Sequence, residues 1–294
     1  MSGENRKKGA VEGKVCIVTG GGGGIGKAIC ERLASEGGKV VIAERNEETG
    51  KSVERELRER GQEAIFISTD VSQESSIESC VKQTVEKYGA IHILVNNAAS
   101  FEFGHLGEPG TGSGKGTDKE ISESAWNSVF QVNVRGPATF IKCVVPHMKR
   151  NDPYGETYSN VQPLGKSEIK AQSRGCIVNV NSVSGFIAQP EFVPYNCSKG
   201  AALQLTRCCA MDLAPWKIRV NAVCPGTVET PASHAHMQLL GLSLEQGRLE
   251  FGRSCLLQRQ ASPEEIAGPV LFLVSDDSSF ITGTTLTVDG GATI

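Results

Sequence analysis

The sequence predicts an α/β protein in which a doubly wound parallel sheet of about seven strands carries helices on both faces, within a single domain. Three observations support this fold class. Short apolar runs of strand length alternate with longer segments of helical pattern from residue 14 to the C-terminal end. A run of glycines joins the first such strand to the first helix, as in many phosphate-binding turns. The 294 residues, 39% of them hydrophobic, suffice for the core of one large domain.

The first expected unit is a strand, a glycine turn and a helix. Residues 1–12 are polar and are expected to form a flexible arm, followed by a strand at 14–19 and a helix at 27–36. Glycines between them let the backbone approach a pyrophosphate, and the helix N-terminus offers free N–H groups. Two registers of the glycine motif fit, namely Gly21-x-Gly23-x-x-Gly26 and Thr19-Gly20-x-x-x-Gly24-Ile25-Gly26.

The other elements follow from the same two periodicities. The further strands are expected at residues 39–44, 64–68, 91–95, 176–180, 217–223 and 284–288. The further helices are expected at residues 46–60, 75–88 and 124–149, from near Tyr195 to about 214, and from Pro263 to about 274. Pro194 and Pro263 suit first helical turns, and the acids after Pro263 suit the positive end of the helix dipole.

An acid ends the second strand. Glu44 stands eighteen residues after Gly26. A carboxylate there can accept both ribose hydroxyls of the adenosine half of NAD and would repel the 2′-phosphate of NADP. Arg45 could instead pair with that phosphate. With Glu44 present and Gly23 uncharged, we expect NAD to be preferred and leave NADP open.

Polar and small residues follow the third and fourth strands, at the edge where ligands bind in open α/β sheets. Asp70 could receive the adenine amino group, or it could cap a loop or a helix. Asn97 and Ala98 belong to a loop that can pass close to a cofactor. The insertion at 100–120 is rich in glycine and is expected to be either a substrate flap or a disordered loop.

Three further features come later in the chain. Asn133 is a polar residue among apolar neighbours, so its amide needs a hydrogen-bonded role, structural or catalytic. The polar insertion at 151–174 is expected on the surface, away from the sheet. Residues 231–258 carry large apolar side chains without a single helical face. They suit a cover over an apolar substrate pocket, although core helices have the same composition.

The stretch from Ser182 to Lys199 carries the candidate chemistry. Tyr195 and Lys199 should lie one turn apart on one helix face, so that their side chains converge. A tyrosine that exchanges a proton at neutral pH needs its phenolate favoured by about 3 pKa units, or about 4 kcal/mol. The ammonium of Lys199 has the right sign to supply much of that.

The ordered set of motifs resembles the short-chain dehydrogenase/reductase family, whose fold is Rossmann-like, over about residues 13 to 291. The set consists of Thr19-Gly20-x-x-x-Gly24-Ile25-Gly26, Asp70-Val71, Asn96-Asn97-Ala98, Asn133, Ser182, Tyr195-x-x-x-Lys199, Pro225-Gly226 and Val288-Asp289-Gly290-Gly291. Two positions depart from the family pattern, because Ala99 replaces a usual glycine and Asn181 a frequent serine.

The resemblance implies a catalytic tetrad of Asn133, Ser182, Tyr195 and Lys199 that interconverts a secondary alcohol and a ketone. Tyr195 would act as base or acid, Ser182 would donate a hydrogen bond to the reacting oxygen, and Asn133 would order a water that passes protons to Lys199. The remaining implied cofactor residues are Gly20, Gly24, Ile25, Gly26, Asp70, Val71, Asn97, Ala98, Pro225, Gly226, Val228 and Thr230, with Tyr195 and Lys199 also contacting the cofactor.

Two other function classes stay open at this point. An epimerase or dehydratase on the same scaffold would bind the cofactor without net reduction, and a non-catalytic dinucleotide sensor would not need the tetrad. The helices near residues 134–149 and 197–214 are apolar on more than one face. Together with the resemblance, this predicts a homo-oligomer, and in particular a tetramer.

Composition argues against several other partners. A formal net charge of -3 gives no basic surface for nucleic acid or for an anionic membrane. No apolar run approaches the roughly 18 residues of a membrane span, and we expect a cytoplasmic protein. The 10 cysteines are scattered through apolar patterns, as reduced core thiols are. Only His234 and His236 are closely spaced histidines, so we expect no structural metal.

Overall fold

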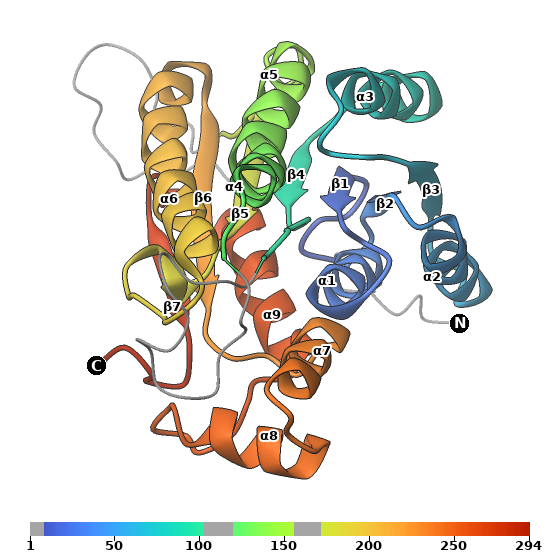
Figure 1. The fold of residues 1–294 in the computed structure, drawn as a ribbon. Helices are drawn as coiled ribbons and strands as arrows, with labels where there is room; N and C mark the ends of the chain where they lie inside the picture. The colour runs from blue at the N-terminus through green and yellow to red at the C-terminus, as the bar shows by residue number, and fades with distance from the viewer. Residues whose placement is uncertain (1–8, 103–119, 156–171) are drawn as a thin grey trace.

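Parallel strands form one sheet in the part of the chain that the computed structural model describes, residues 9–102, 120–155 and 172–294 (Figure 1). The strands are β1 (Val15–Thr19), β2 (Lys39–Glu44), β3 (Ala64–Ser68), β4 (Ile93–Asn96), β5 (Gly175–Val180), β6 (Ile218–Pro225) and β7 (Thr285–Val288). The α-helices are α1 (Gly24–Ser35), α2 (Glu47–Glu59), α3 (Glu74–Tyr88), α4 (Glu123–Phe130), α5 (Gly136–Met148), α6 (Val193–Leu213), α7 (Pro231–Leu239), α8 (Leu244–Gly252) and α9 (Pro263–Val274). The predicted fold class is confirmed, since these elements make a single doubly wound, Rossmann-like domain.

The order of the strands determines where a ligand can bind. The sheet runs β3-β2-β1-β4-β5-β6-β7, and every neighbouring pair is parallel. The chain moves outward from β1 to β3 and then returns to place β4 on the other side of β1. The direction of winding therefore reverses between β1 and β4, and the carboxyl ends of these strands flank a crevice typical of ligand sites.

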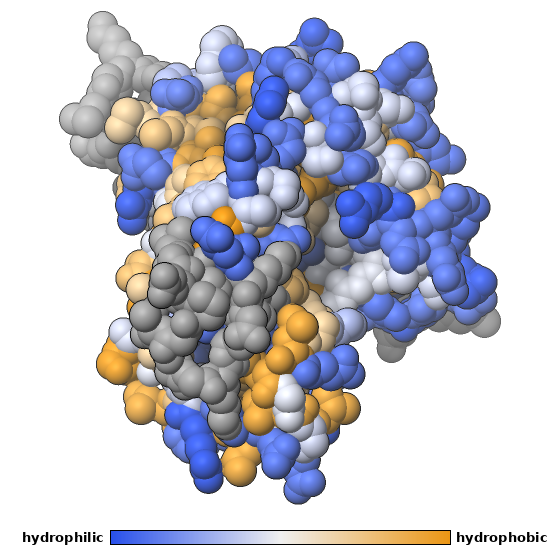
Figure 2. All heavy atoms as spheres, in the orientation of Figure 1, coloured by the Kyte–Doolittle hydropathy of each residue, from blue (hydrophilic) through white to orange (hydrophobic). Residues whose placement is uncertain are grey.

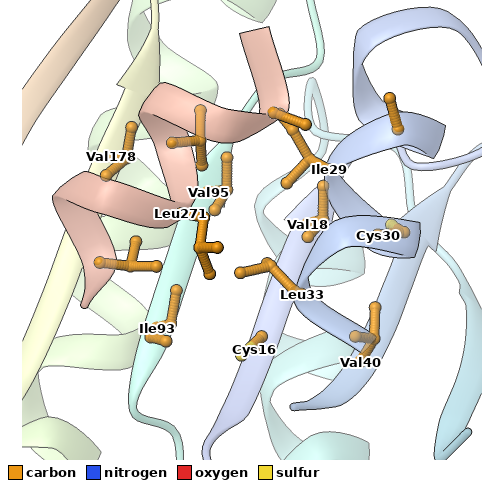
Figure 3. Close-up of a cluster of buried hydrophobic side chains, with 14 of the residues drawn as sticks. Cys16, Val18, Ile29, Cys30, Leu33, Val40, Ile93, Val95, Val178 and Leu271 are labelled. Atoms are coloured by element: carbon orange, nitrogen blue, oxygen red, sulfur yellow. The ribbon is translucent and has the colours of Figure 1, made fainter. Parts of the chain in front are cut away.

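Helices cover both faces of the sheet and bury its apolar strands. One face packs against α1, α2 and α9, and the other against α3, α5 and α6. Figure 3 shows part of the first face, where Ile29 and Leu33 of α1 meet Val18 of β1, Val95 of β4 and Leu271 of α9. Leu33 is fully buried, so its truncation to alanine would cost about 2–5 kcal/mol of stability.

Capping residues fix the starts of several helices. The side chain of Asn46 accepts hydrogen bonds from the backbone N–H groups of Glu48 and Thr49 at the start of α2. At the start of α9 the carboxylate of Glu265 accepts from the N–H of Ser262, which confirms the predicted capped start.

Several boundaries differ from the sequence-based prediction. The expected flexible arm is wrong for residues 9–12, because the apolar side chain of Val11 is buried in the core and its N–H donates to the carbonyl of Glu36. Residues 1–8 lie outside the described part. Helix α1 begins at Gly24, three residues earlier than predicted, and β6 extends two residues further, through Pro225. Glycine propensity had suggested a later helix start, and packing overrides it.

The surface is unevenly polar. Figure 2 shows mainly hydrophilic residues over α2 and α3, whereas hydrophobic residues gather in the lower part of the view over α7 and α8. The large hydrophobic side chains exposed in this region include Leu239, Leu244 and Leu249. The predicted insertions at 100–120 and 151–174 fall mostly outside the described residues, which exclude 103–119 and 156–171. In the rest of the chain, none of the helices is both long and apolar enough to span a membrane.

Candidate active site

The glycine turn adopts the second of the two registers. Gly20 and Gly24 have φ angles of 64° and 50°, in the left-handed region that favours glycine. A Cβ atom on Gly26 would lie 2.0 Å from the carbonyl oxygen of Gly20, so only glycine allows α1 to pack so closely on the turn. Gly23, by contrast, has open space around its Cα. Gly21 and Gly22 also leave little room for a Cβ, but the left-handed conformations of Gly20 and Gly24 favour the Thr19-Gly20-x-x-x-Gly24-Ile25-Gly26 pattern.

A cavity of about 480 Å³ lies at the carboxyl ends of β1 to β4. Its walls include most of the cofactor-binding residues predicted before the fifth strand: Gly20, Gly24, Ile25, Glu44, Arg45, Asp70, Val71, Asn97 and Ala98. Sequence reasoning missed Thr69, Ser100, Phe101, Ser128 and Val132, which line the same cavity. Gly26 is not among the lining residues, and its role is the close packing described above.

Glu44 is held at the rim of this cavity by the backbone. Its Oε2 accepts a hydrogen bond from the N–H of Gly22 at 3.2 Å, and its Oε1 accepts from the N–H of Asn46 at 2.8 Å. Each carboxylate oxygen keeps further acceptor capacity for a hydroxyl group. Asp70 also caps its own loop, because its Oδ1 accepts from the N–H and the hydroxyl of Ser72. The capping role of Asp70 therefore does not exclude binding of the adenine amino group, the other role expected from the sequence.

These residues fit a dinucleotide. The N-terminal end of α1 opens toward the cavity through Gly24 and Ile25, and Gly23 has no side chain to cap it. Unpaired N–H groups and the positive end of a helix dipole suit a pyrophosphate. Glu44 lines the same cavity with a carboxylate that can accept hydroxyl groups, and the glycine turn leaves room for close approach of a ligand.

Asn133 ties three segments together. It lies in a π-helical turn, η1 (Gln131–Arg135), and only 3% of its surface is exposed. Its Oδ1 accepts from the N–H of Ser100 at 2.8 Å, and its Nδ2 donates to the carbonyl of Ser100 at 2.7 Å and to the Oγ of Ser198 at 3.0 Å. Ser198 in turn donates to the carbonyl of Tyr195 at 2.7 Å. The amide thus joins the β4 loop to the start of α6, and the predicted water relay stays a prediction.

The other three candidate residues meet beside β5. Tyr195 and Lys199 lie on successive turns of α6, with the Nζ of Lys199 5.5 Å from the centre of the tyrosine ring. Ser182 is the N-cap of a 3₁₀ turn, η2 (Val183–Gly185), and its hydroxyl donates to the Oγ of Ser184 at 3.0 Å. The Oγ of Ser184 then donates to the Oε1 of Gln189. The predicted convergence of Tyr195 and Lys199 is confirmed.

The electrostatic expectation for Tyr195 is wrong for this state of the protein. Burial raises the pKa of its phenol to about 12, although hydrogen bonding with Ser182 opposes the rise. Burial also lowers the pKa of Lys199 to about 8, and its Nζ donates to the carbonyl of Val180. Loss of hydration is the largest cause of both shifts, because burial disfavours the charged form of each group. Tyr195 therefore holds its proton at neutral pH.

A second cavity, of about 440 Å³, lies on the other side of these residues. Ser182, Tyr195, Pro225, Gly226, Val228 and Thr230 line it, as do Ser184, Gln189, Phe192, His236 and Phe251, which sequence reasoning did not single out. Ile25, Phe101 and Thr230 line both cavities, so the two adjoin. Residues of α7 and α8 form one wall of this cavity, and the predicted role of residues 231–258 as a cover over a substrate pocket stays a prediction.

Lys199 lines neither cavity and is only 4% exposed, so its side chain does not reach either cavity in this structure. Thr230 is the N-cap of α7, and its Oγ1 accepts from the N–H of Ser233. Of the residues in the described ranges 9–102, 120–155 and 172–294, none form a His, Cys, Asp or Glu cluster suited to a metal ion. All ten thiols are free, and Cys197 and Cys208 are exposed although a core position was expected.

Comparisons with known proteins agree with this geometry. The model of the short chain dehydrogenase family matches residues 14–157, and a model described as enoyl-(acyl carrier protein) reductase matches residues 157–293. Cyclopentanol dehydrogenase of Comamonas testosteroni is 35% identical over 285 residues, which are 97% of this chain and 99% of that protein.

Two solved structures have the same fold. The 3-ketoacyl-(acyl-carrier-protein) reductase of Brucella melitensis, complexed with NADH, superposes with a TM-score of 0.77 at 30% identity and covers 97% of this chain and all of its own. The aldohexose dehydrogenase of Thermoplasma acidophilum gives a TM-score of 0.76 at 31% identity, over 96% of this chain and 94% of its own. The chain therefore belongs to the short-chain dehydrogenase/reductase family of NAD(P)-dependent oxidoreductases.

Proposed function

We propose that this protein interconverts a secondary alcohol and a ketone by hydride transfer. One observation carries the proposal. Tyr195 and Ser182 lie together in the wall of a pocket that adjoins, at Ile25 and Thr230, the cavity beside the glycine turn. A bound nicotinamide cofactor would supply the ring that accepts or donates the hydride. The relatives named dehydrogenases support the same reaction class.

Each of the four candidate residues has a role that matches its position. Tyr195 is protonated in the free protein, so it can donate its proton to a ketone oxygen, and in alcohol oxidation it takes that proton back. Ser182 donates a hydrogen bond to the same oxygen as charge develops there, once its hydroxyl turns away from Ser184. Lys199 favours the phenolate by its charge, and Asn133 holds α6 in register with the β4 loop.

We further propose NAD as the preferred cofactor. The carboxylate of Glu44, fixed by two backbone N–H groups, can accept the ribose hydroxyls and repels a 2′-phosphate. Arg45 lines the same cavity and leaves NADP as the competing cofactor. Val228 and Thr230 would hold the nicotinamide carboxamide on the side of the second cavity.

A homotetramer is the assembly that we propose. Helix α6 buries one face on the sheet and leaves the opposite face exposed, with Met211 79% exposed and Cys208 also at the surface. These exposed apolar side chains suit pairing with the same helix of a second copy. The C-terminal strand region would form the second interface. A cytoplasmic location stays a prediction from the sequence.

The test is an assay of the purified protein with NAD or NADP and a panel of secondary alcohols, followed by the absorbance of the reduced nicotinamide. We expect reduction with at least one alcohol and the reverse reaction with its ketone. Cofactor binding with conversion of substrate but no net reduction would favour an epimerase or dehydratase. Cofactor binding with no conversion of any substrate would favour a sensor and would contradict the proposal.

A further inference from the structure

A continuous series of rings lines the second cavity outward from Tyr195. Phe192, three residues before Tyr195, meets its ring edge at 6.0 Å between centres. Phe192 then meets the imidazole of His236 on α7 at 5.1 Å, and His236 meets Phe251 on α8 at 5.3 Å. On the other side Phe101 meets Tyr195 at 6.3 Å. Aromatic side chains therefore supply part of the cavity wall close to the place where a carbon would react at Tyr195.

Such walls favour a rigid ring over a flexible chain. A compact saturated ring gains van der Waals contact and buries apolar area against these side chains. An open chain of the same carbon number must also lose rotational freedom when it enters the pocket. Ile187 and Val228, which line the same cavity, add aliphatic contacts.

The charges of the pocket restrict the substrate further. None of the described residues that line it is a lysine or an arginine. Burial lowers the pKa of His236, so its imidazole is neutral at pH 7. Among the described lining residues, the one carboxylate is that of the exposed Glu250. A negatively charged substrate would thus lose its hydration without meeting a cation among these residues.

We propose that the physiological substrate is an uncharged secondary alcohol, or the matching ketone, whose reacting carbon belongs to a ring. This inference rests on the alcohol oxidation proposed above. The ring lies against Phe192, His236 and Phe251. These three side chains form a substrate-binding wall and set specificity, and they take no part in proton transfer.

The first experiment compares kcat/KM for cyclohexanol and hexan-2-ol, two secondary alcohols of equal carbon number. We expect cyclohexanol to be favoured by about 10-fold, because hexan-2-ol loses more rotational freedom on binding. Phe192→Leu and Phe251→Leu should each reduce this preference to about 3-fold or less. Phe272→Leu is the matched control, because Phe272 is exposed on α9 outside the pocket, and it should leave the ratio unchanged.

The second experiment compares trans-4-hydroxycyclohexanecarboxylate with its methyl ester. The ester should be favoured by roughly 100-fold, because the carboxylate meets no cation. His236→Arg adds a cation that can stack between two phenyl rings, and it should reduce this preference at least tenfold.

Equal or better turnover of hexan-2-ol or of the carboxylate would overturn the inference. If other secondary alcohols are oxidised and none of these cyclic ones is, the inference is wrong and the proposed function stands. If no secondary alcohol is oxidised at all, the proposed function fails, and the inference fails with it.

Discussion

Replacing Ser198 with alanine should lower both the stability and the turnover of this protein. Ser198 is fully buried, and its hydroxyl is the only link in the described contacts between the amide of Asn133 and the backbone of Tyr195. The substitution removes the hydrogen bond to the carbonyl of Tyr195. It also leaves one N–H of Asn133 without an acceptor, in a place that water does not reach.

The magnitude follows from these two losses. An orphaned buried N–H costs about 1–3 kcal/mol, and the loss of the bond to Tyr195 adds up to about 1 kcal/mol. For a chain of this size each kcal/mol lowers Tm by about 2–4 °C. A shift of Tyr195 relative to the β4 loop should also reduce kcat about 10-fold or more, since catalysis is sensitive to small misplacements.

A second buried hydroxyl on the same helix provides the control. Thr206 is also fully buried, donates to the carbonyl of Ala202 at 3.0 Å and accepts from the Nδ2 of Asn179 at 2.9 Å. Thr206→Val should therefore destabilise the protein by a similar amount in urea or thermal denaturation. It lies away from Tyr195 and should leave kcat nearly unchanged. Equal effects of the two substitutions on kcat would refute the positioning role of Ser198.

Three further predictions concern the cofactor, the pH dependence and the assembly. Glu44→Ala should weaken NAD binding relative to NADP by about 10-fold, the value of one hydrogen bond to a charged group, in a fluorescence titration; an unchanged ratio would assign the choice to Arg45. Burial, with nearby lysines, lowers the pKa of His92 to about 4, and its Nδ1 accepts from the N–H of Val15. The unfolded state then takes up the proton first, so stability should fall as the pH falls from about 6.5 to 4, and His92→Gln should flatten this slope in urea denaturation. Met211→Glu should shift the protein to smaller species in sedimentation and lower its activity, and an active monomer of the unmodified protein would contradict the proposed assembly.

The sequence predicted the features that depend on residues close together in the chain. Tyr195 and Lys199 lie four residues apart on a helix, so their convergence follows from helical geometry alone. The alternation of apolar runs and helical segments likewise predicted the parallel sheet, because only βαβ connections satisfy it. The ambiguity of five consecutive glycines was resolved by a tertiary contact, the packing of Gly26 on Gly20.

What the sequence could not predict depends on contacts between distant segments. The pKa of Tyr195 is set by burial under several elements, and a lysine one turn away does not reveal that burial. The aromatic wall takes Phe192, His236 and Phe251 from three separate helices or helix ends. The partnership of Asn133 with Ser198 spans 65 residues. The only local sequence feature that indicated this partnership was Ser198 itself, a polar residue directly before Lys199.

The most direct test of the proposed chemistry is Tyr195→Phe. The variant keeps the aromatic ring and its contacts with Phe101 and Phe192, and it removes only the hydroxyl that exchanges the proton. We predict that kcat falls by at least about 10²-fold while the affinity for NAD stays within a factor of about two. Turnover within tenfold of the unmodified protein would show that another group transfers the proton, and would contradict the proposed role of Tyr195.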